Sequence, residues 1–116
     1  MALYTCYYYT KSNGKAPVKE FIDSLDTVTQ TKFFFKKALL EEHGTRLPAP
    51  HCHRLKEDVF ELRFQGSSGH IRVLYFFAFR NIIIFTNGFK KKTNKVPKDE
   101  LLLAVKRRAD FLSREK

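Results

Sequence analysis

The chain has 116 residues and a formal net charge of +10, from 22 lysines and arginines against 12 aspartates and glutamates. Its length fits one domain, and its 43% of hydrophobic residues can form a packed core, which argues against wholesale disorder. The sequence contains no apolar run long enough to span a bilayer, no secretory signal pattern and only two cysteines. We therefore expect a single domain over residues 1–116, located in the cytoplasm, with both cysteines reduced.

The first third of the chain shows one strand pattern and one helix pattern. Residues 3–10 are aromatic and β-branched, which predicts a strand that ends before the turn-forming pair Asn13-Gly14. Pro17 suits the first position of a helix. The apolar stripe of this helix comprises Val18, Phe21, Ile22 and Leu25.

A second helix is predicted to follow with almost no linker. Thr27 and Gln30 have the spacing of a capping box, and Gly44 is placed to end the helix. Residues 45–53, with two prolines, are expected to be a loop. The apolar face of the second helix is expected to continue through Val28, Phe35 and Leu39.

The second half of the chain predicts an antiparallel sheet and a last helix. Residues 59–64 alternate in polarity, whereas residues 71–79 and 82–89 are apolar on both faces, as in strands covered on both sides. Pro97 begins the last helix. The order β-α-α-β-β-β-α indicates an α+β fold, with a small antiparallel-rich sheet, a helical hairpin and a C-terminal helix; we expect the helices on one face.

Positive charge is concentrated near the end of this predicted sheet. Residues 89–116 carry 10 basic and 4 acidic side chains, and so supply +6 of the net charge. Such a concentration indicates a polyanionic partner, such as a nucleic acid, an anionic membrane or an acidic protein. A solvated charged helix is the alternative, but the run Lys90-Lys91-Lys92 ends a strand.

Two arginines precede these lysines on the predicted strands. Three consecutive antiparallel strands would bring Arg63, Arg72 and residues 90–92 together on a sheet surface. Guanidinium and ammonium groups held there can bind a phosphate and stabilise the charge of a pentacoordinate phosphorane. The structural alternative is that Arg63 pairs with Glu61 or Asp58 and that Arg72 only supports the sheet.

The histidines are interpreted separately. His51, Cys52 and His53 resemble metal ligands, but no second Cys/His pair completes a tetrahedral site, so no metal is expected. His53 could act as a general base, because imidazole titrates near neutral pH. His70 directly precedes Ile71-Arg72 and could contact a substrate from the turn.

Several motifs together resemble the phage-derived branch of the RelE/HigB-type toxins of toxin–antitoxin systems. The motifs are Phe60-Glu61-Leu62-Arg63, Ile71-Arg72-Val73-Leu74-Tyr75-Phe76, and Asn87-Gly88-Phe89-Lys90-Lys91-Lys92-Thr93 with Lys95 and Pro97. The resemblance extends upstream to Pro17, Glu20-Phe21-Ile22-Asp23-Ser24-Leu25 and Leu55-Lys56, and so covers most of the chain.

This resemblance implies a RelE-like fold and a ribosome-dependent mRNA endoribonuclease that uses the RNA 2′-hydroxyl as nucleophile and needs no metal or cofactor. It also implies mRNA, the ribosome and a helix-turn-helix antitoxin as partners, with no membrane partner. Arg72, Arg63 and either Lys90 or Lys91 match catalytic cations of the family, and further RNA-binding residues are expected at Lys56, Lys92 and Lys95.

The sequence departs from the best-known relatives at two places. Val59 and Glu61 stand where those relatives have lysines, and a tyrosine is missing near Val96-Pro97. His53 is therefore our first substitute for the general base, and Glu61 the second. The alternative function is that of a non-catalytic basic prophage protein that binds RNA or an antitoxin without cutting.

Overall fold

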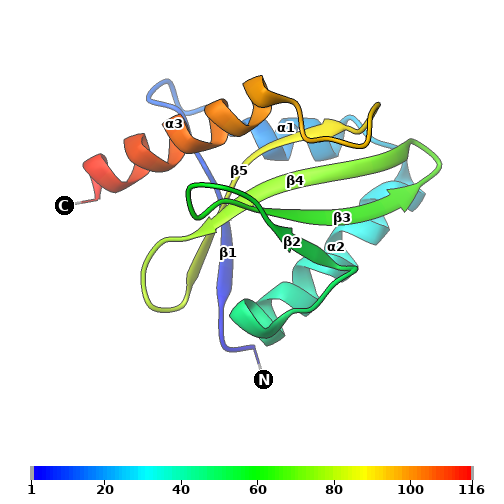
Figure 1. The fold of residues 1–116 in the computed structure, drawn as a ribbon, viewed down its shortest axis with the longest axis horizontal. Helices are drawn as coiled ribbons and strands as arrows, with labels where there is room; N and C mark the ends of the chain where they lie inside the picture. Colours follow the sequence, from blue (N-terminus) through cyan, green and yellow to red (C-terminus); the bar gives the residue numbers. More distant parts are fainter. Residues whose placement is uncertain (1, 116) are drawn as a thin grey trace.

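The computed structural model describes residues 2–115 as a five-stranded sheet with helices packed on both faces (Figure 1). The strands are β1 (Thr5–Tyr8), β2 (Cys52–Arg54), β3 (Phe60–Gly66), β4 (Gly69–Phe77) and β5 (Ile82–Lys90). The helices are α1 (Pro17–Asp23), α2 (Thr27–His43), a 3-10 turn at Gly44–Arg46, and α3 (Lys98–Arg114). No helix in residues 2–115 is long and apolar enough to cross a membrane.

The sheet has the strand order β1-β5-β4-β3-β2. Strand β1 runs parallel to β5, whereas β2, β3, β4 and β5 pair in antiparallel fashion through consecutive turns. The mixed α+β fold class is therefore confirmed. The expected loop over 45–53 is wrong at its end, because residues 52–54 pair with Phe60, Glu61 and Leu62 as a short edge strand.

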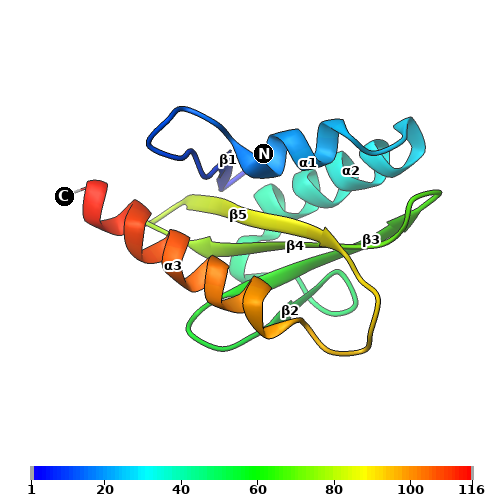
Figure 2. The same cartoon turned by 90° about the horizontal axis from the view of Figure 1, so that it is seen from above.

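The helices do not lie on one face of the sheet, as the sequence had led us to expect. Helices α1 and α2 cover one face and α3 covers the other (Figure 2). The physical reason is the apolar character of both faces of β4. Val73 and Tyr75 join the core under α1 and α2, whereas Leu74 and Phe76 pack with residues of α3.

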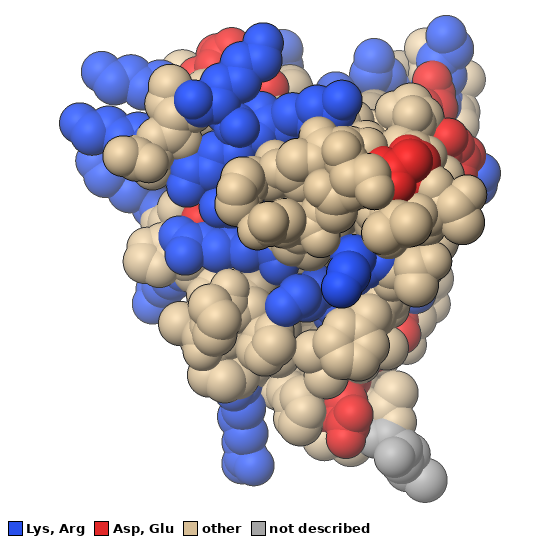
Figure 3. All heavy atoms as spheres, turned by 90° about the vertical axis from the view of Figure 1, so that its right-hand side faces the viewer, with Lys and Arg blue, Asp and Glu red and all other residues tan. Residues whose placement is uncertain are grey.

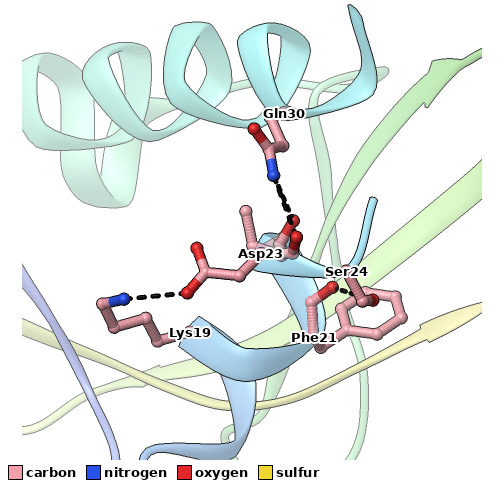
Figure 4. A network of polar contacts seen from close by, with 6 residues as sticks. Lys19, Phe21, Asp23, Ser24 and Gln30 are labelled. Atoms are coloured by element: carbon pink, nitrogen blue, oxygen red, sulfur yellow. Dashed lines mark hydrogen bonds and ion pairs between the residues drawn. The ribbon is translucent and has the colours of Figure 1, made fainter. Parts of the chain in front are cut away.

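The connection between α1 and α2 is held by side chains that differ from the predicted cap. Asp26, not Thr27, is the N-cap of α2, and its carboxylate accepts a hydrogen bond from the Thr29 amide. Gln30 instead donates to the Ile22 and Asp23 carbonyls at the end of α1 (Figure 4). Gly44 ends α2 as predicted, with φ of 53° and the Tyr4 ring where a Cβ would lie.

The buried face of α2 also differs from the predicted one. Phe33 and Leu40 are fully buried, whereas Val28 and Phe35 are more than half exposed. Several apolar residues lie next to one another in this helix, so periodicity alone fits more than one face. The contacts with β3 select the face of Phe33, whose ring packs against Phe64.

Candidate anion-binding site

Arg63 and Arg72 face each other across two neighbouring strands. They are direct partners in the β3–β4 register. Residues paired in this way project from the same face of the sheet, and for Arg72 it is the face of Leu74 and Phe76, as predicted. Two like charges in this position repel each other unless an anion lies between them.

Glu61 supplies that anion. Its side chain is 2% exposed, and its Oε1 lies 2.7 Å from Arg63 Nε and 3.8 Å from Arg72 Nε. The structural alternative, a pairing of Arg63 with Glu61, is therefore present in the fold. This pairing does not neutralise both cations. One carboxylate carries a single negative charge against two guanidinium groups, so the triad keeps a net charge of +1.

Arg72 retains unused hydrogen-bonding groups. Its Nη1 donates to the Ile71 carbonyl at 2.9 Å, and its buried Nε makes no hydrogen bond with any of residues 2–115. Burial lowers the pKa of Arg72, and Arg63 lowers it further, while Glu61 opposes both effects. A guanidinium has five N–H donors, so Arg72 can still bind an anion through several of them.

A polar pocket of about 250 Å³ lies on one side of Arg72. We call it the loop pocket, because most of its residues come from the segment after β5. The Lys91 amide donates to the His70 carbonyl at 2.8 Å, which ties this segment to the start of β4. The loop pocket is lined by His70, Arg72, Lys91, Lys92, Thr93 and Asn94.

The structure distinguishes between Lys90 and Lys91, either of which could match the second catalytic cation that the resemblance implies. Lys90 pairs with Ile71 at the end of β5 and lines a different pocket, beside Pro97 and Glu100 at the start of α3. Lys91 lies one residue further and lines the loop pocket with Arg72. Lys91 is therefore the lysine that shares a site with Arg72, and Lys90 is not.

A second groove, of about 580 Å³, also borders Arg72. We call it the helix groove, because two lysines of α2 form one of its walls. It contains Arg63 as well as Arg72, and it shares His70 with the loop pocket. The helix groove is lined by Lys32, Lys36, Pro50, Arg63, Phe64, Gln65, His70 and Arg72.

Lys36 is held in place at this groove by His51. Its Nζ lies 2.7 Å from His51 Nδ1, and the His51 carbonyl accepts a hydrogen bond from the Arg63 amide at 2.9 Å. Burial lowers the pKa of Lys36, with a further contribution from Lys32. Burial likewise lowers the pKa of His51, assisted by Lys36 and His43.

The sequence missed the contribution of α2 to the site. Lys32 and Lys36 lie four residues apart on one helix face, where like charges destabilise a helix. Lys37, by contrast, has Glu41 four residues later and forms an ion pair with it. A lysine pair without acidic neighbours at helical spacing was the signal that could have identified this wall.

Three further residues that the sequence predicted as site residues, His53, Lys95 and Lys56, lie outside the loop pocket and the helix groove. His53 is exposed on the edge strand opposite Glu61, on the same face but outside both pockets. Lys95 is exposed in the segment between β5 and α3, where its carbonyl accepts a bond from Thr93. Lys56 lies in the turn between β2 and β3, beyond the Phe60 end of β3, and so away from Arg72.

The β3–β4 turn, which presents His70, is anchored to the start of α2. Thr29 is fully buried; its Oγ1 donates to Asp26 Oδ1 at 2.6 Å and accepts from the Ser68 amide at 3.1 Å. The Ser68 hydroxyl also donates to Asp26. Hydrogen bonds from Ser68 and Thr29 lower the pKa of Asp26. This anchor fixes the turn next to the lysines of α2.

Lys and Arg side chains gather at the end of the molecule that carries the β3–β4 turn and the segment after β5 (Figure 3). No group of three His, Cys, Asp or Glu side chains within residues 2–115 could hold a metal ion. Cys52 donates to the Leu47 carbonyl, on the core side of β2. The arrangement favours binding of phosphate groups by guanidinium and ammonium donors.

The comparisons with known proteins support the phage-derived origin that the motifs suggested. No curated protein matches the chain in sequence. A family model described as phage-derived protein Gp49-like (DUF891) matches residues 20–109, which span α2, all of β2 to β5, and most of α3. Over most of its length, therefore, the chain belongs to the Gp49-like family of phage-derived proteins, which is associated with type II toxin–antitoxin systems.

Proposed function

We propose that the protein is the toxin of a toxin–antitoxin pair and cleaves mRNA on the ribosome. The observation that carries the proposal is the group of cations around Arg72. Arg63 stands directly opposite it, Lys91 lines the same pocket, and their shared carboxylate Glu61 leaves the group positively charged. Preorganised donors of this kind stabilise the charge that develops on a phosphate during transfer.

The proposed reaction is an attack by the RNA 2′-oxygen on the adjacent phosphorus. The bond from phosphorus to the 5′-oxygen breaks, which leaves a 2′,3′-cyclic phosphate and a 5′-hydroxyl end. Arg72 and Arg63 bind the phosphate oxygens of the transition state. The Lys91 ammonium donates a proton to the leaving 5′-oxygen. These cations supply the positive charge that metal ions supply in many other nucleases.

The proton of the 2′-hydroxyl requires an acceptor. His70 lies two residues before Arg72 and lines both pockets with it, so we assign this role to His70. His53 lies on the same face of the sheet, which makes it a candidate, but it lies outside both pockets and therefore ranks second. Glu61 is fully buried between two arginines, and we assign it the role of positioning them.

The proposal includes a neutralising partner. A basic nuclease that cuts mRNA would harm its own cell unless an antitoxin covers its site. An acidic segment laid against Arg63, Arg72 and Lys91 would do so directly, and the resemblance suggests a helix-turn-helix protein as its carrier. Purification of the tagged protein together with the product of the adjacent gene tests this: we expect a complex that dissociates more readily as salt rises.

The function is tested by inducing the protein alone in cells and mapping mRNA 5′ ends. We expect growth arrest and new ends within translated codons for the wild type, and neither for Arg72→Ala. Arg80→Ala is the matched control, because Arg80 is exposed at the β4–β5 turn and its removal changes the net charge equally. Binding of RNA without any new 5′ ends would instead favour the non-catalytic alternative.

A further inference from the structure

The loop pocket and the helix groove adjoin at Arg72 and His70, and each has its own pair of lysines. Lys91 and Lys92 line the loop pocket, whereas Lys32 and Lys36 line the helix groove. We infer that the two pockets bind two successive phosphates of one RNA strand, with Arg72 and His70 between them. This inference rests on the proposed function for the identity of the ligand.

The first observation behind it is the lack of counter-ions. Within residues 2–115, none of Lys32, Lys36, Lys91 and Lys92 forms an ion pair with a carboxylate, whereas Arg63 and Arg72 in the same pockets pair with Glu61. On α2 itself, Lys37 pairs with Glu41 at 3.4 Å. The fold thus leaves unneutralised the lysines that line the two pockets.

The second observation is the placement of Lys36. Its hydrogen bond with His51 Nδ1 fixes the amino group at the wall of the helix groove. Arg63 of β3 lines the same groove. A protonated amino group has three N–H donors, so two remain for an anion after the bond to His51. An anion bound there would also offset the repulsion between Lys32 and Lys36.

The third observation is that Arg72 can serve both pockets. It lines each of them and is more than nine-tenths buried. Its buried Nε faces Glu61 and its Nη1 donates to the Ile71 carbonyl, so the remaining N–H groups of the two Nη atoms are the donors left for phosphates. Arg72 is therefore placed between the two bound phosphates, while the lysine pairs bind their outer sides.

The experiment measures binding of a single-stranded tetranucleotide with 2′-O-methyl groups, which cannot be cut by the proposed reaction. For single strands, the slope of log K against log salt changes by roughly 0.7 for each phosphate contact. We expect Lys32→Ala/Lys36→Ala to reduce the slope by roughly that amount, Lys91→Ala/Lys92→Ala to do the same, and the quadruple variant to show both losses. Lys11→Ala/Lys15→Ala is the matched control in the exposed segment between β1 and α1.

The outcomes separate this inference from the proposed function. An unchanged slope in Lys32→Ala/Lys36→Ala, with the wild type still cleaving mRNA, would overturn the two-phosphate site and leave the nuclease intact. Two additive losses of slope in a protein that never cleaves mRNA would support the site and overturn the nuclease. A loss equal to that of the Lys11→Ala/Lys15→Ala control would show that only net charge matters, and would overturn the inference.

Discussion

Arg63 and Arg72 occupy directly opposite positions on β3 and β4, and both lie beside the same oxygen of Glu61, at 2.7 and 3.8 Å. The pair of like charges is thus part of the folded sheet, stabilised by a carboxylate that is almost completely buried. Removing any one of the three groups changes the environment of the other two.

Glu61→Gln is expected to lower the free energy of unfolding. Breaking a buried pair by removing one partner typically costs about 3–5 kcal/mol; we expect about 3 kcal/mol, because the Arg63 side chain is one-third exposed and partly solvated. Urea unfolding followed by circular dichroism measures this. Glu61→Gln/Arg63→Gln should recover part of the loss, since only one buried cation then remains; a double variant no more stable than Glu61→Gln would contradict this account.

The two neighbouring lysines at the end of β5 should behave differently. Lys91→Ala is expected to show a measurable part of the roughly 0.7 in slope that the Lys91→Ala/Lys92→Ala variant loses, because Lys91 lines the loop pocket. Lys90→Ala removes the same charge, but Lys90 lies outside the loop pocket and the helix groove, so the slope of this variant should stay close to that of the wild type. Equal effects of the two substitutions would contradict the assignment of the phosphate contact to Lys91 rather than Lys90.

The hydrogen bonds of Thr29 and Asp26 with Ser68 anchor the β3–β4 turn to α2, and this anchor can be tested by substitution. Thr29→Val removes the hydroxyl that accepts from the Ser68 amide and donates to Asp26. Leaving these groups unpaired should cost about 1–3 kcal/mol in unfolding free energy and increase hydrogen exchange of the β3–β4 turn. Thr31→Val is the control, because Thr31 is exposed and its hydroxyl donates to the Thr27 carbonyl of its own helix; exchange rates that rise equally in both variants would contradict the anchor.

Alkaline pH should destabilise the fold through Cys6. Burial raises the pKa of this thiol from 9.0 to about 12, with Glu41 adding to the effect and Lys37 opposing it. The unfolded chain therefore releases the proton first, so the stabilisation present below pH 9 is lost as pH rises toward 12. We expect Cys6→Ala to show a shallower fall in unfolding free energy between pH 9 and 10 than wild type or Cys52→Ala, and parallel curves for all three would contradict this assignment.

The sequence predicted the order of the main elements, and it placed Arg63 and Arg72 on adjacent strands, because turn residues and alternation of polarity are local signals. It could not predict that α3 covers the second face, although the apolar residues on both sides of β4 indicated that something must. The short strand β2 has no periodicity of its own; it exists because Cys52–Arg54 pair with β3.

The candidate site was predictable only in part, because some of its contacts form only in the tertiary structure. Arg72 and Lys91 follow strand patterns that fix their face of the sheet. Lys36 of α2 contacts His51, which directly precedes β2. This tertiary contact depends on which face of α2 is buried. Phe33, not Phe35, packs against the sheet, and no local pattern distinguishes these neighbouring phenylalanines.

The most direct test of the central claim uses purified ribosomes programmed with a defined mRNA and the purified protein. We predict cleavage that leaves a 2′,3′-cyclic phosphate, that stops when the nucleotide before the cut is 2′-deoxy, and that slows about 100–1000-fold in Arg72→Ala, the usual effect of losing one preorganised donor. Cleavage that persists at the 2′-deoxy position, or an Arg72→Ala protein that is folded and cuts at the wild-type rate, would contradict it.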